Sequence, residues 1–392
     1  MPSVTLPPLA GGPAEAQHSG IREVVNLALA DRQCIRLEVG EPAFPTPKHI
    51  VEAAVEHARS GMVRYTATAG RADLRERLVS KLRTVNGLEA RATEINVTAG
   101  GVGGIAAAMA AVVEAGDEVL IPDPGWPNYR LMLSWIGGRI VPYPCEPGNG
   151  FLPTPEDIER LITPRTKLLV INSPNNPTGA VFPQRLVEEI TMLAERNNLY
   201  LLSDECYDQV IMDGCHVSPA SLCRDGRVIS AFTFSKTYAM TGWRVGYVVA
   251  NPTITDSITK ILESNSSCVS SISQVAALAA LDGPQASLTM MVDAYRQRRD
   301  LCVQLLQGSQ MLISRPQGAF YVMADIGRSG VDARRLAFDL LARAHLAVAP
   351  GTAFGETARQ SVRISLASSE SSLREGISRL VKHVDGMAAD RI

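Results

Sequence analysis

The sequence carries almost no net charge. Its 392 residues include 38 Lys and Arg and 40 Asp and Glu, which gives a formal net charge of -2 at pH 7. A basic surface is what attracts nucleic acids and anionic membranes, so we expect neither as a partner. The composition favours a soluble enzyme that acts on small molecules.

Paired cysteines are missing as well. Seven cysteines are scattered along the chain, and none of them forms a C-x-x-C pair with another. The sequence therefore contains no zinc-binding pattern and no disulfide framework, and we predict that no metal is bound. Free thiols persist in reducing compartments, so we expect the protein in the cytoplasm.

We also expect neither a secretory signal nor a membrane span. The first residues, MPSVTLPPLAGGP, contain no basic region followed by an apolar one, and we interpret them as a loose arm. The longest apolar run, residues 97–113, is mostly Gly and Ala and is shorter than the ~20 residues that cross a bilayer. We expect its glycines, residues 100–104, to break the first turns of such a helix. A buried strand, a turn and a helix explain the run better.

What the sequence does contain is a series of short apolar runs that alternate with helical patterns, in a chain that is 46% hydrophobic. Strands buried on both faces of a parallel sheet read as continuous apolar runs, and helices between them are typical of α/β folds. We predict a mostly parallel central sheet with helices on both faces. Its strands are expected at EINVTA, DEVLIPD, GRIVPYP, TKLLVIN, LYLLSD and RVISAFTF.

The pattern changes near residue 285. Charged helices such as DAYRQRRDLCVQLL and ARRLAFDLLARA follow, interrupted by two strand candidates, GAFYVMADI and SVRISLA. A chain of this length can build two cores. We predict a large domain of residues 46–285 and a smaller α+β domain, which joins residues 286–392 to an N-terminal arm, residues 1–45.

Lys236 lies just past RVISAFTF, the last predicted strand of the sheet. Open α/β sheets bind their ligands at the carboxyl ends of the strands. A lysine amine serves covalent catalysis when it condenses with a carbonyl, and pyridoxal 5'-phosphate is the cofactor that exploits this reaction. The position therefore predicts that Lys236 binds this cofactor.

Groups that suit a phosphate surround this lysine. Thr233 and Ser235 offer hydroxyls, and Arg244 offers the planar set of donors that phosphate oxygens accept. A glycine-rich turn that opens a helix can hold the same anion with its N–H groups. The residues expected to do so are Gly100, Gly101 and Val102.

The cofactor ring and the substrate make further demands. A buried carboxylate stabilises the protonated ring nitrogen, and Asp204, which ends the apolar strand LYLLSD, is the candidate. Tyr207 in the following loop and Asn176 in SPNNPTG are candidates for bonds to the ring phenolate oxygen. Trp126 in PDPGWPNY is placed to stack on the ring, and we expect it to border the substrate together with Asn176. Arg363 in SVRISLA offers a bidentate guanidinium to the substrate carboxylate from the second domain.

Each of these residues, taken alone, could have a purely structural role, such as a helix cap, a surface charge, core packing or a turn. Other classes of protein therefore have to be considered.

Residues from Gly101 to Ala106 fit G-x-G-x-x-A, with Asp123 about twenty residues beyond, which is the dinucleotide-binding fingerprint. An NAD-dependent dehydrogenase would leave Lys236 and its flanking groups without a shared purpose. A regulator that senses a ligand would need a DNA-binding domain, for which the residues before Gly40 leave no room.

The motifs occur in one order along nearly the whole chain. That order resembles the fold type I, class I/II pyridoxal-phosphate-dependent aminotransferases of the aspartate aminotransferase superfamily. The matching strings are VGEPAFPTP, YTATAG, VTAGG, NNPTG, SDECY, FSKTYAMTGWRVGY, QGAFYV, APGTAFG and VRIS.

The resemblance implies Schiff-base formation and proton transfer by Lys236, with Asp204 and Tyr207 as the other catalytic residues, and it supports the roles given above. It also implies a homodimer with shared active sites. In such a dimer Tyr65 reaches the phosphate of the neighbouring subunit's cofactor, and Gly40 lies near the substrate carboxylate. The expected reaction moves an amino group between an L-amino acid and an α-keto acid. The same residues also support a C–S or β-lyase or an amino-acid oxidase, because the pocket selects the bond that breaks.

The substrate side chain is the least determined feature. By resemblance, aspartate-specific relatives hold the distal carboxylate with an added cation, in some of them a lysine shortly after the glycine pair. Val102 stands there in this chain, and the segment ESNSSCVSSISQ, from Glu263, holds no Lys or Arg. We therefore expect neutral or apolar side chains to be favoured over aspartate, with Arg22 as a candidate compensating cation.

Overall fold

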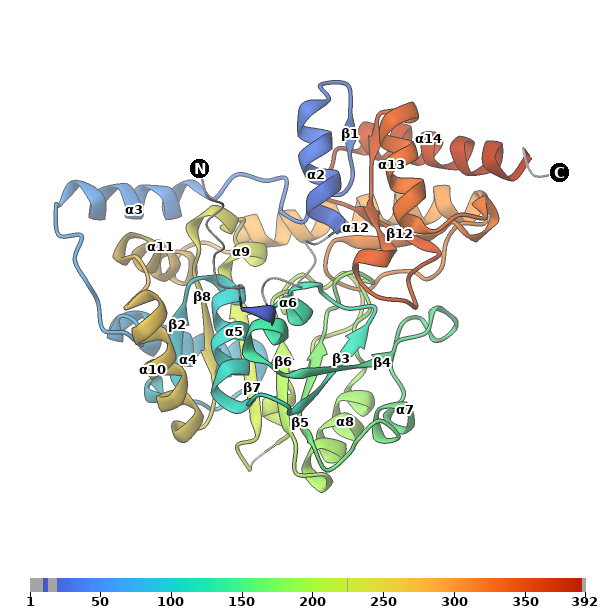
Figure 1. Cartoon of the computed structure of the whole chain (residues 1–392). Helices are drawn as coiled ribbons and strands as arrows, with labels where there is room; N and C mark the ends of the chain where they lie inside the picture. The colour runs from blue at the N-terminus through green and yellow to red at the C-terminus, as the bar shows by residue number, and fades with distance from the viewer. Residues whose placement is uncertain (1–9, 13–19, 224, 390–392) are drawn as a thin grey trace, which may run out of the picture.

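A seven-stranded sheet forms the centre of this computed structural model, which describes residues 10–12, 20–223 and 225–389 (Figure 1). The strands lie in the order β2-β8-β7-β6-β5-β3-β4, and the neighbours from β7 to β4 are all parallel. Their bounds are β2 Ile95–Thr98, β3 Glu118–Asp123, β4 Arg139–Pro144, β5 Thr166–Asn172, β6 Tyr200–Asp204, β7 Val228–Thr233 and β8 Gly246–Val249. The predicted α/β fold with a mostly parallel central sheet is confirmed.

The sequence does not predict one strand of this sheet, β8. It lies between β2 and β7 and runs antiparallel to both. Thr233 at the end of β7 pairs with Gly246 at the start of β8. The chain between them carries Lys236 and Arg244, so both side chains belong to one connection at the edge of the sheet. β8 escapes prediction because its short apolar run directly continues the motif that carries the lysine.

The glycine-rich run forms the first turns of helix α5, Gly100–Val112. Gly100 begins this helix with a φ of 74°, a conformation that favours glycine. A Cβ on Gly104 would lie 2.6 Å from Cγ2 of Val248 in β8. The expectation that residues 100–104 break these turns is wrong, because close packing on the sheet compensates for the low helix propensity of glycine.

Helices cover both faces of the sheet (Figure 1). The helices around it are α3 Lys48–Arg59, α4 Ala72–Asn86, α6 Asn128–Ile136, α7 Pro155–Glu159, α8 Gln184–Arg196, α9 Phe234–Thr237, α10 Pro252–Ser266 and α11 Ser271–Asp282. Val119 and Ile121 of β3 join a buried cluster with α5, α6 and α10, whereas Leu120 joins a cluster with α7 and α8. Successive strand residues point to opposite faces, so this alternation places a helical layer on each side.

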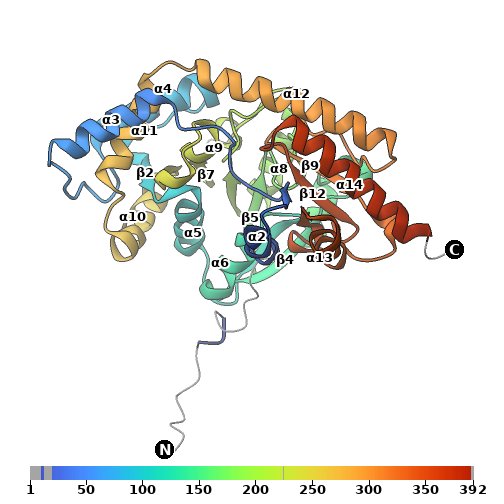
Figure 2. The ribbon, with the colours of Figure 1, turned by 90° about the horizontal axis from the view of Figure 1, so that it is seen from above.

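A second, smaller group of strands lies beside the central sheet. β9 Tyr321–Asp325, β11 Ala349–Pro350 and β12 Ser361–Ser365 form an antiparallel sheet, and β1 Ile35–Arg36 pairs in parallel with β10 Leu346–Ala347. The helices that share its core are α2 Gly20–Ala30, α12 Ala286–Gly308, α13 Ala333–Ala344 and α14 Glu370–Ala389. Figure 2 shows α12 running from the helices of the central sheet to this second group. The N-terminal residues of β1 thus join the C-terminal part of the chain.

The exact division into two domains stays a prediction. Residues 1–9 and 13–19 of the predicted arm, and residues 390–392 of the predicted small domain, lie outside the described residues. Among the described helices, none alone is long and apolar enough to cross a membrane. The pair of α11 and α12 passes the same test of length and composition, but the two helices are bent by 82°.

Candidate active site

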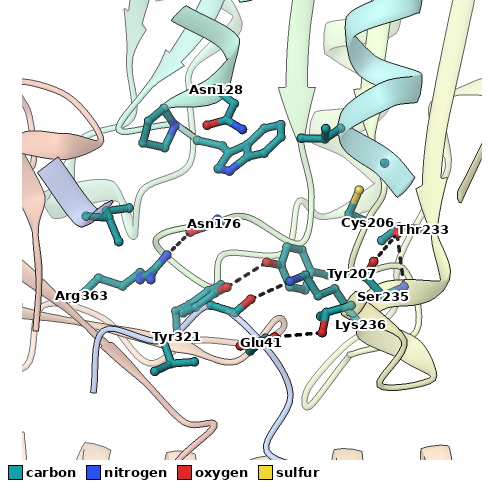
Figure 3. Close-up of a pocket in the computed structure, with 18 of the residues that line it drawn as sticks. Glu41, Asn128, Asn176, Cys206, Tyr207, Thr233, Ser235, Lys236, Tyr321 and Arg363 are labelled. Atoms are coloured by element: carbon teal, nitrogen blue, oxygen red, sulfur yellow. Dashed lines mark hydrogen bonds between the residues drawn. The ribbon is translucent and has the colours of Figure 1, made fainter. Parts of the chain in front are cut away.

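A cavity of about 510 Å³ opens at the carboxyl ends of β5, β6 and β7, next to the second group of strands (Figure 3). This volume is in the range of small-molecule and cofactor sites. The structure brings most of the predicted site residues together around it. Those that line it are Gly40, Gly101, Val102, Trp126, Asn176, Asp204, Tyr207, Thr233, Ser235, Lys236, Arg244 and Arg363.

Two predicted site residues do not line the cavity. Gly100 lies directly behind it, and a Cβ at this position would come within 2.7 Å of Nη2 of Arg244. Tyr65 lies on the connection between α3 and α4, and its side chain is 92% exposed. Tyr65 therefore belongs to the surface of this subunit and not to its cavity.

Lys236 occupies the middle of the cavity, in the short helix α9 that follows β7. Its Nζ donates a hydrogen bond to the carbonyl oxygen of Gly40 at 2.6 Å. Burial lowers the pKa of this amine to about 8, and the charges of Arg363 and Arg244 act in the same direction. A lysine with such a depressed pKa is partly neutral near physiological pH, which is the form that attacks a carbonyl.

One end of the cavity is built to hold an anion. Arg244 adopts a left-handed conformation with φ of 53°, and its Nη1 donates to the carbonyl oxygen of Thr241 at 2.8 Å. No carboxylate pairs with it among the described residues. The hydroxyl of Thr233 donates to that of Ser235 at 2.9 Å. A Cβ on Gly101 would meet Sγ of Cys206 at 2.7 Å, so the close packing at the N-terminus of α5 favours glycine here. Backbone N–H groups at such a helix start can bind an anion.

Asp204 ends β6 with a carboxylate that is almost entirely buried, 4% exposed. Its Oδ2 accepts a hydrogen bond from the Tyr129 hydroxyl at 2.5 Å, and its Oδ1 accepts one from the Cys206 backbone N–H at 3.2 Å. Burial raises the pKa of Asp204, and the bonds from Cys206 and Tyr129 oppose that effect. A carboxylate held in this way suits a cationic ring nitrogen. Trp126 lies nearby, with its ring edge-on to Tyr129 at 5.3 Å.

Tyr207 and Asn176 connect the middle of the cavity to its other end (Figure 3). The hydroxyls of Tyr207 and Tyr321 are 3.0 Å apart. Burial raises the pKa of the Tyr207 phenol, so it remains a donor. Asn176 accepts a hydrogen bond from Nη1 of Arg363 through its amide oxygen, at 2.8 Å. The amide nitrogen of Asn176 is the end that remains for a ligand oxygen.

Arg363 forms this other end of the cavity, on the central strand β12 of the small sheet. It is only 2% exposed, and its Nη2 donates to the carbonyl oxygen of Glu38 at 2.7 Å. The guanidinium lies 4.1 Å from the centre of the Tyr321 ring and 5.0 Å from that of Phe354. Among the described residues it forms no ion pair. A buried cation without a counter-ion is costly unless an anionic ligand binds there.

Sequence reasoning misses several residues of this site. Cys206 and Tyr321 line the cavity, and both stand inside motif strings, SDECY and QGAFYV, which were a signal for their position. Tyr129 lies behind the cavity, and its role becomes visible only through its bond to Asp204. Arg22, the candidate compensating cation, is exposed at the cavity wall.

The dinucleotide-binding alternative does not fit the structure. The carboxylate of Asp123 accepts hydrogen bonds from the backbone N–H groups of Glu356 and Thr357, and also from the Thr357 hydroxyl. It is therefore used to fix the loop after β11, and it does not line the cavity. In a dinucleotide-binding site Asp123 would bind a ribose hydroxyl of the cofactor. Its carboxylate is instead used for hydrogen bonds within the protein.

Comparison with known proteins agrees with this geometry. Residues 32–380 match the family described as aminotransferase class I and II. The aspartate/prephenate aminotransferase of Thermus thermophilus is 39% identical over 351 residues, 89% of this chain and 90% of that protein. The aromatic-amino-acid aminotransferase 2 of Thermococcus litoralis is 35% identical over 371 residues, 93% of this chain and 95% of that protein. The structure of Thermus thermophilus aspartate aminotransferase with maleate superposes with a TM-score of 0.92 at 36% identity, covering 96% of this chain and 100% of that one.

Proposed function

The chain belongs to the aminotransferase class I and II family, and from that premise we propose which residues carry out the transfer and which amino acids it takes. It is a pyridoxal-phosphate-dependent aminotransferase, which moves an amino group between an amino acid and an α-keto acid. Our assignment of catalytic and binding roles to these residues rests mainly on one observation. Lys236, with its depressed pKa of about 8, faces a cavity with an arginine at each end, Arg244 and Arg363. Neither arginine has a carboxylate partner among the described residues.

Pyridoxal phosphate supplies, when bound, a carbonyl carbon for an amine and a cationic ring that withdraws electrons from the substrate. Arg244, Thr233 and Ser235 would hold its phosphate, together with the N–H groups that begin α5. Asp204 would hold its protonated ring nitrogen, because a buried carboxylate stabilises a neighbouring cation. The open glycine cradle beside Arg244 and the buried carboxylate both fit this cofactor.

Three side chains would fix the ring in its plane. Tyr207 and the amide nitrogen of Asn176 would donate to the phenolate oxygen, since both are neutral donors that line the cavity. Trp126, which also lines the cavity, would stack on the ring. This arrangement leaves the other polar groups of the cavity to the substrate.

Lys236 has two tasks in this proposal. Its amine would hold the cofactor covalently between turnovers, and when an incoming amine has taken its place, the free Nζ would serve as the base for the proton on Cα of the substrate. A general base works best when its pKa is near the working pH, and about 8 meets that condition. The bond to the Gly40 carbonyl aims Nζ toward the substrate end of the cavity.

The covalent attachment can be located directly. Borohydride reduction of the purified protein, followed by proteolysis and mass spectrometry, should find the pyridoxyl group on the peptide that contains Lys236. Attachment to another lysine, such as the exposed Lys48, would refute the assignment.

Arg363 receives the α-carboxylate of the substrate. The guanidinium is fixed by Asn176 and by the carbonyl of Glu38, and it is flanked by the Tyr321 ring. A planar guanidinium that is already oriented can bind a carboxylate with two parallel hydrogen bonds. Gly40 borders this place, because a Cβ there would lie 3.9 Å from Nη2 of Arg363.

We propose that neutral or apolar amino acids are favoured over aspartate. Val102 lines the cavity where a lysine would be expected for a distal carboxylate. Arg36 also lines it, but its guanidinium is paired with Glu38 at 2.6 Å. The exposed Arg22 is a further cation on that wall, and it has no carboxylate partner among the described residues. The relative named for aromatic amino acids supports this preference, whereas the relative named for aspartate and prephenate stands against it.

The test is a comparison of kcat/KM for aspartate with the values for alanine, phenylalanine and leucine, at saturating keto acid. The proposal predicts a higher value for at least one neutral amino acid. A value for aspartate well above all the others would refute it, and Arg22→Ala would then show whether Arg22 holds the second carboxylate.

We also propose a homodimer with shared active sites. Tyr65 is 92% exposed, and the apolar side chains of Met62, Val63, Val51 and Val55 are exposed near it in sequence. Exposed apolar side chains on one stretch of the chain favour an interface with a second copy. In the dimer the Tyr65 hydroxyl would reach the phosphate of the second subunit's cofactor. Sedimentation should give twice the mass of the chain, and Tyr65→Phe should weaken cofactor binding; a monomer with full activity would contradict both.

The cytoplasm remains our proposal for the compartment. It rests on the seven cysteines, all of which are described and form no disulfide. Fractionation of the source cells, with an antibody to the protein, would test it.

A further inference from the structure

The carboxylate of Asp204 has to stay ionised where burial disfavours its charge. Burial is the largest influence on its pKa and raises it, and the charge of Glu205 acts in the same direction. Hydrogen bonds from Cys206 and Tyr129 lower it. Whether Asp204 can hold a cation is therefore decided by the donors that face it.

Tyr129 is the donor with the closest approach. Its hydroxyl lies 2.5 Å from Oδ2 of Asp204, which is the length of a hydrogen bond to an ionised carboxylate. Tyr129 is completely buried in α6, and burial together with the charge of Asp204 raises the pKa of its phenol. The phenol therefore keeps its proton and acts as a donor. Within the described part of the chain, Asp204 is the hydrogen-bond partner of this hydroxyl.

The same side chain also supports the face of the cavity. The ring of Tyr129 meets the ring of Trp126 edge-on, at 5.3 Å and an interplanar angle of 85°. Tyr129 thus contacts both the residue that would cover the cofactor ring and the residue that would hold its nitrogen. It does so from outside the cavity, since it is not one of the lining residues.

We propose that Tyr129 is a positioning residue of this aminotransferase, which keeps Asp204 ionised and aimed at the ring nitrogen of the cofactor. The proposal rests on the role proposed above for Asp204. The phenol occupies one lone pair of Oδ2, the backbone N–H of Cys206 occupies one of Oδ1, and the Cys206 thiol also donates to the carboxylate. A carboxylate has about four such sites, so about one is left for a donor in the cavity.

The groups around Asp204 come from three elements. Cys206 and Glu205 belong to the loop that follows Asp204. Lys236 of α9 acts on the neighbouring Cys206 thiol through its charge. Tyr129 belongs to α6. Tyr129 is thus the donor that does not move with the loop of Asp204. It ties the carboxylate to α6, a helix outside that loop.

The test removes one hydroxyl and keeps the ring. Tyr129→Phe retains the contact with Trp126 and deletes the bond to Asp204. In cofactor-free protein labelled with ¹³C-aspartate, the carboxyl signal of Asp204 is assigned with Asp204→Asn and followed against pH. The midpoint should rise by at least about one unit, a tenfold change in proton affinity, because the ionised form loses a donor. The matched control is Tyr143→Phe, which deletes an equally buried hydroxyl that donates to the Val170 carbonyl at 2.8 Å.

A second measurement follows the cofactor itself. In protein loaded with pyridoxal phosphate labelled with ¹⁵N in the ring, Tyr129→Phe should release the ring proton at a lower pH than the wild type and the Tyr143→Phe control. If Tyr129→Phe does not fold, 3-fluorotyrosine placed at position 129 keeps a hydroxyl of greater acidity, and the Asp204 midpoint should then fall.

The outcomes separate this proposal from the one on which it rests. An unchanged Asp204 midpoint in the Tyr129 variants overturns the positioning role, while the role of Asp204 can still stand. A shifted midpoint with an unchanged ring nitrogen overturns the claim that Tyr129 acts on the cofactor through Asp204. Failure of the wild type to bind pyridoxal phosphate overturns the proposed function, independently of the cofactor-free titration.

Discussion

The two ends of the cavity each present an arginine, and the two are built differently. Arg244 is exposed, lies in the connection between β7 and β8, and donates to the carbonyl of Thr241, three residues away, and more weakly to that of Ala99, which precedes α5. Arg363 is 2% exposed, lies on a central strand, and is fixed by residues far away in the sequence. Neither has a carboxylate partner in the described part of the chain. One anion site therefore lies within the central sheet and the helix α5 packed on it, and the other depends on packing between the two groups of strands.

This difference suggests which anion each arginine binds, the cofactor phosphate or the substrate carboxylate. The site at Arg244 shares its ligand with hydroxyls and backbone N–H groups of a single sheet edge, which suits a phosphate that stays bound through many turnovers. The site at Arg363 exists only when Asn176, Glu38 and Tyr321 come together. It suits a carboxylate that must bind and leave in each half-reaction. Lys236 lies between the two.

Removing Lys236 should reduce the rate of transamination more than any other change, because we propose that it binds the cofactor and also deprotonates the substrate. Lys236→Ala loses the covalent hold on the cofactor and the base that removes the Cα proton. We expect the rate of transamination to fall by at least ~10³-fold, while the fold is retained. Steady-state assays and thermal unfolding test this, with the surface variant Lys48→Ala as control. Turnover near the wild-type rate would mean that another residue is the base.

Arg363→Ala should affect mainly the substrate end. Binding of the amino acid should weaken by ~2–5 kcal/mol, the range for truncating one partner of a buried, hydrogen-bonded charge pair. The dissociation constant of the cofactor should change little. Titrations with an unreactive carboxylate analogue measure the first quantity, and reconstitution of cofactor-free protein measures the second. An unchanged KM would show that another residue holds the carboxylate.

Arg244→Ala should give the opposite pattern with a smaller effect. It removes one donor among several, so we expect the cofactor to bind about tenfold more weakly, while the KM for the amino acid at saturating cofactor stays close to that of the wild type. Equal losses in both quantities would mean that the two ends are not independent.

The pH dependence of cofactor incorporation should sharpen the comparison further. The amine of Lys236 must be neutral to attack the carbonyl, and burial lowers its pKa to about 8. The rate of incorporation into cofactor-free protein should therefore rise with pH and level off above about 8. Both arginines disfavour the charged amine, so Arg363→Ala and Arg244→Ala should each move the midpoint upward. A rate that still rises toward pH ~10, as for an ordinary lysine, would contradict the depressed pKa.

The sequence predicts the local site well and the packed site only in part. Lys236, Ser235 and Arg244 stand in one contiguous motif, and Asp204 ends a strand that its apolar run reveals. The sequence does not reveal the hydrogen-bond partners that Arg363 and Asp204 find at remote positions in the chain. Tyr129 is 75 residues from Asp204 along the chain. No local pattern marks such a contact, since it exists only once the helix packs on the sheet.

The same reason explains the errors in the fold. The sequence predicts six strands of the central sheet but not β8, whose apolar run merges with the lysine motif. The glycines of residues 100–104 suggest a broken helix, because their propensity is local, whereas the close approach of Gly104 to Val248 is a tertiary contact. Tertiary packing thus overrides helix propensity in the first turns of α5, whose N-terminus we propose as part of the phosphate site.

The absorbance spectrum of the purified holoprotein, titrated with single amino acids in the absence of any keto acid, tests the central claim most directly. Transamination predicts that the band of the lysine-bound cofactor gives way to the band of pyridoxamine phosphate, with one keto acid released per cofactor. If pyruvate, ammonia or peroxide accumulates while the original band persists, the same residues are performing lyase or oxidase chemistry, and the account is wrong.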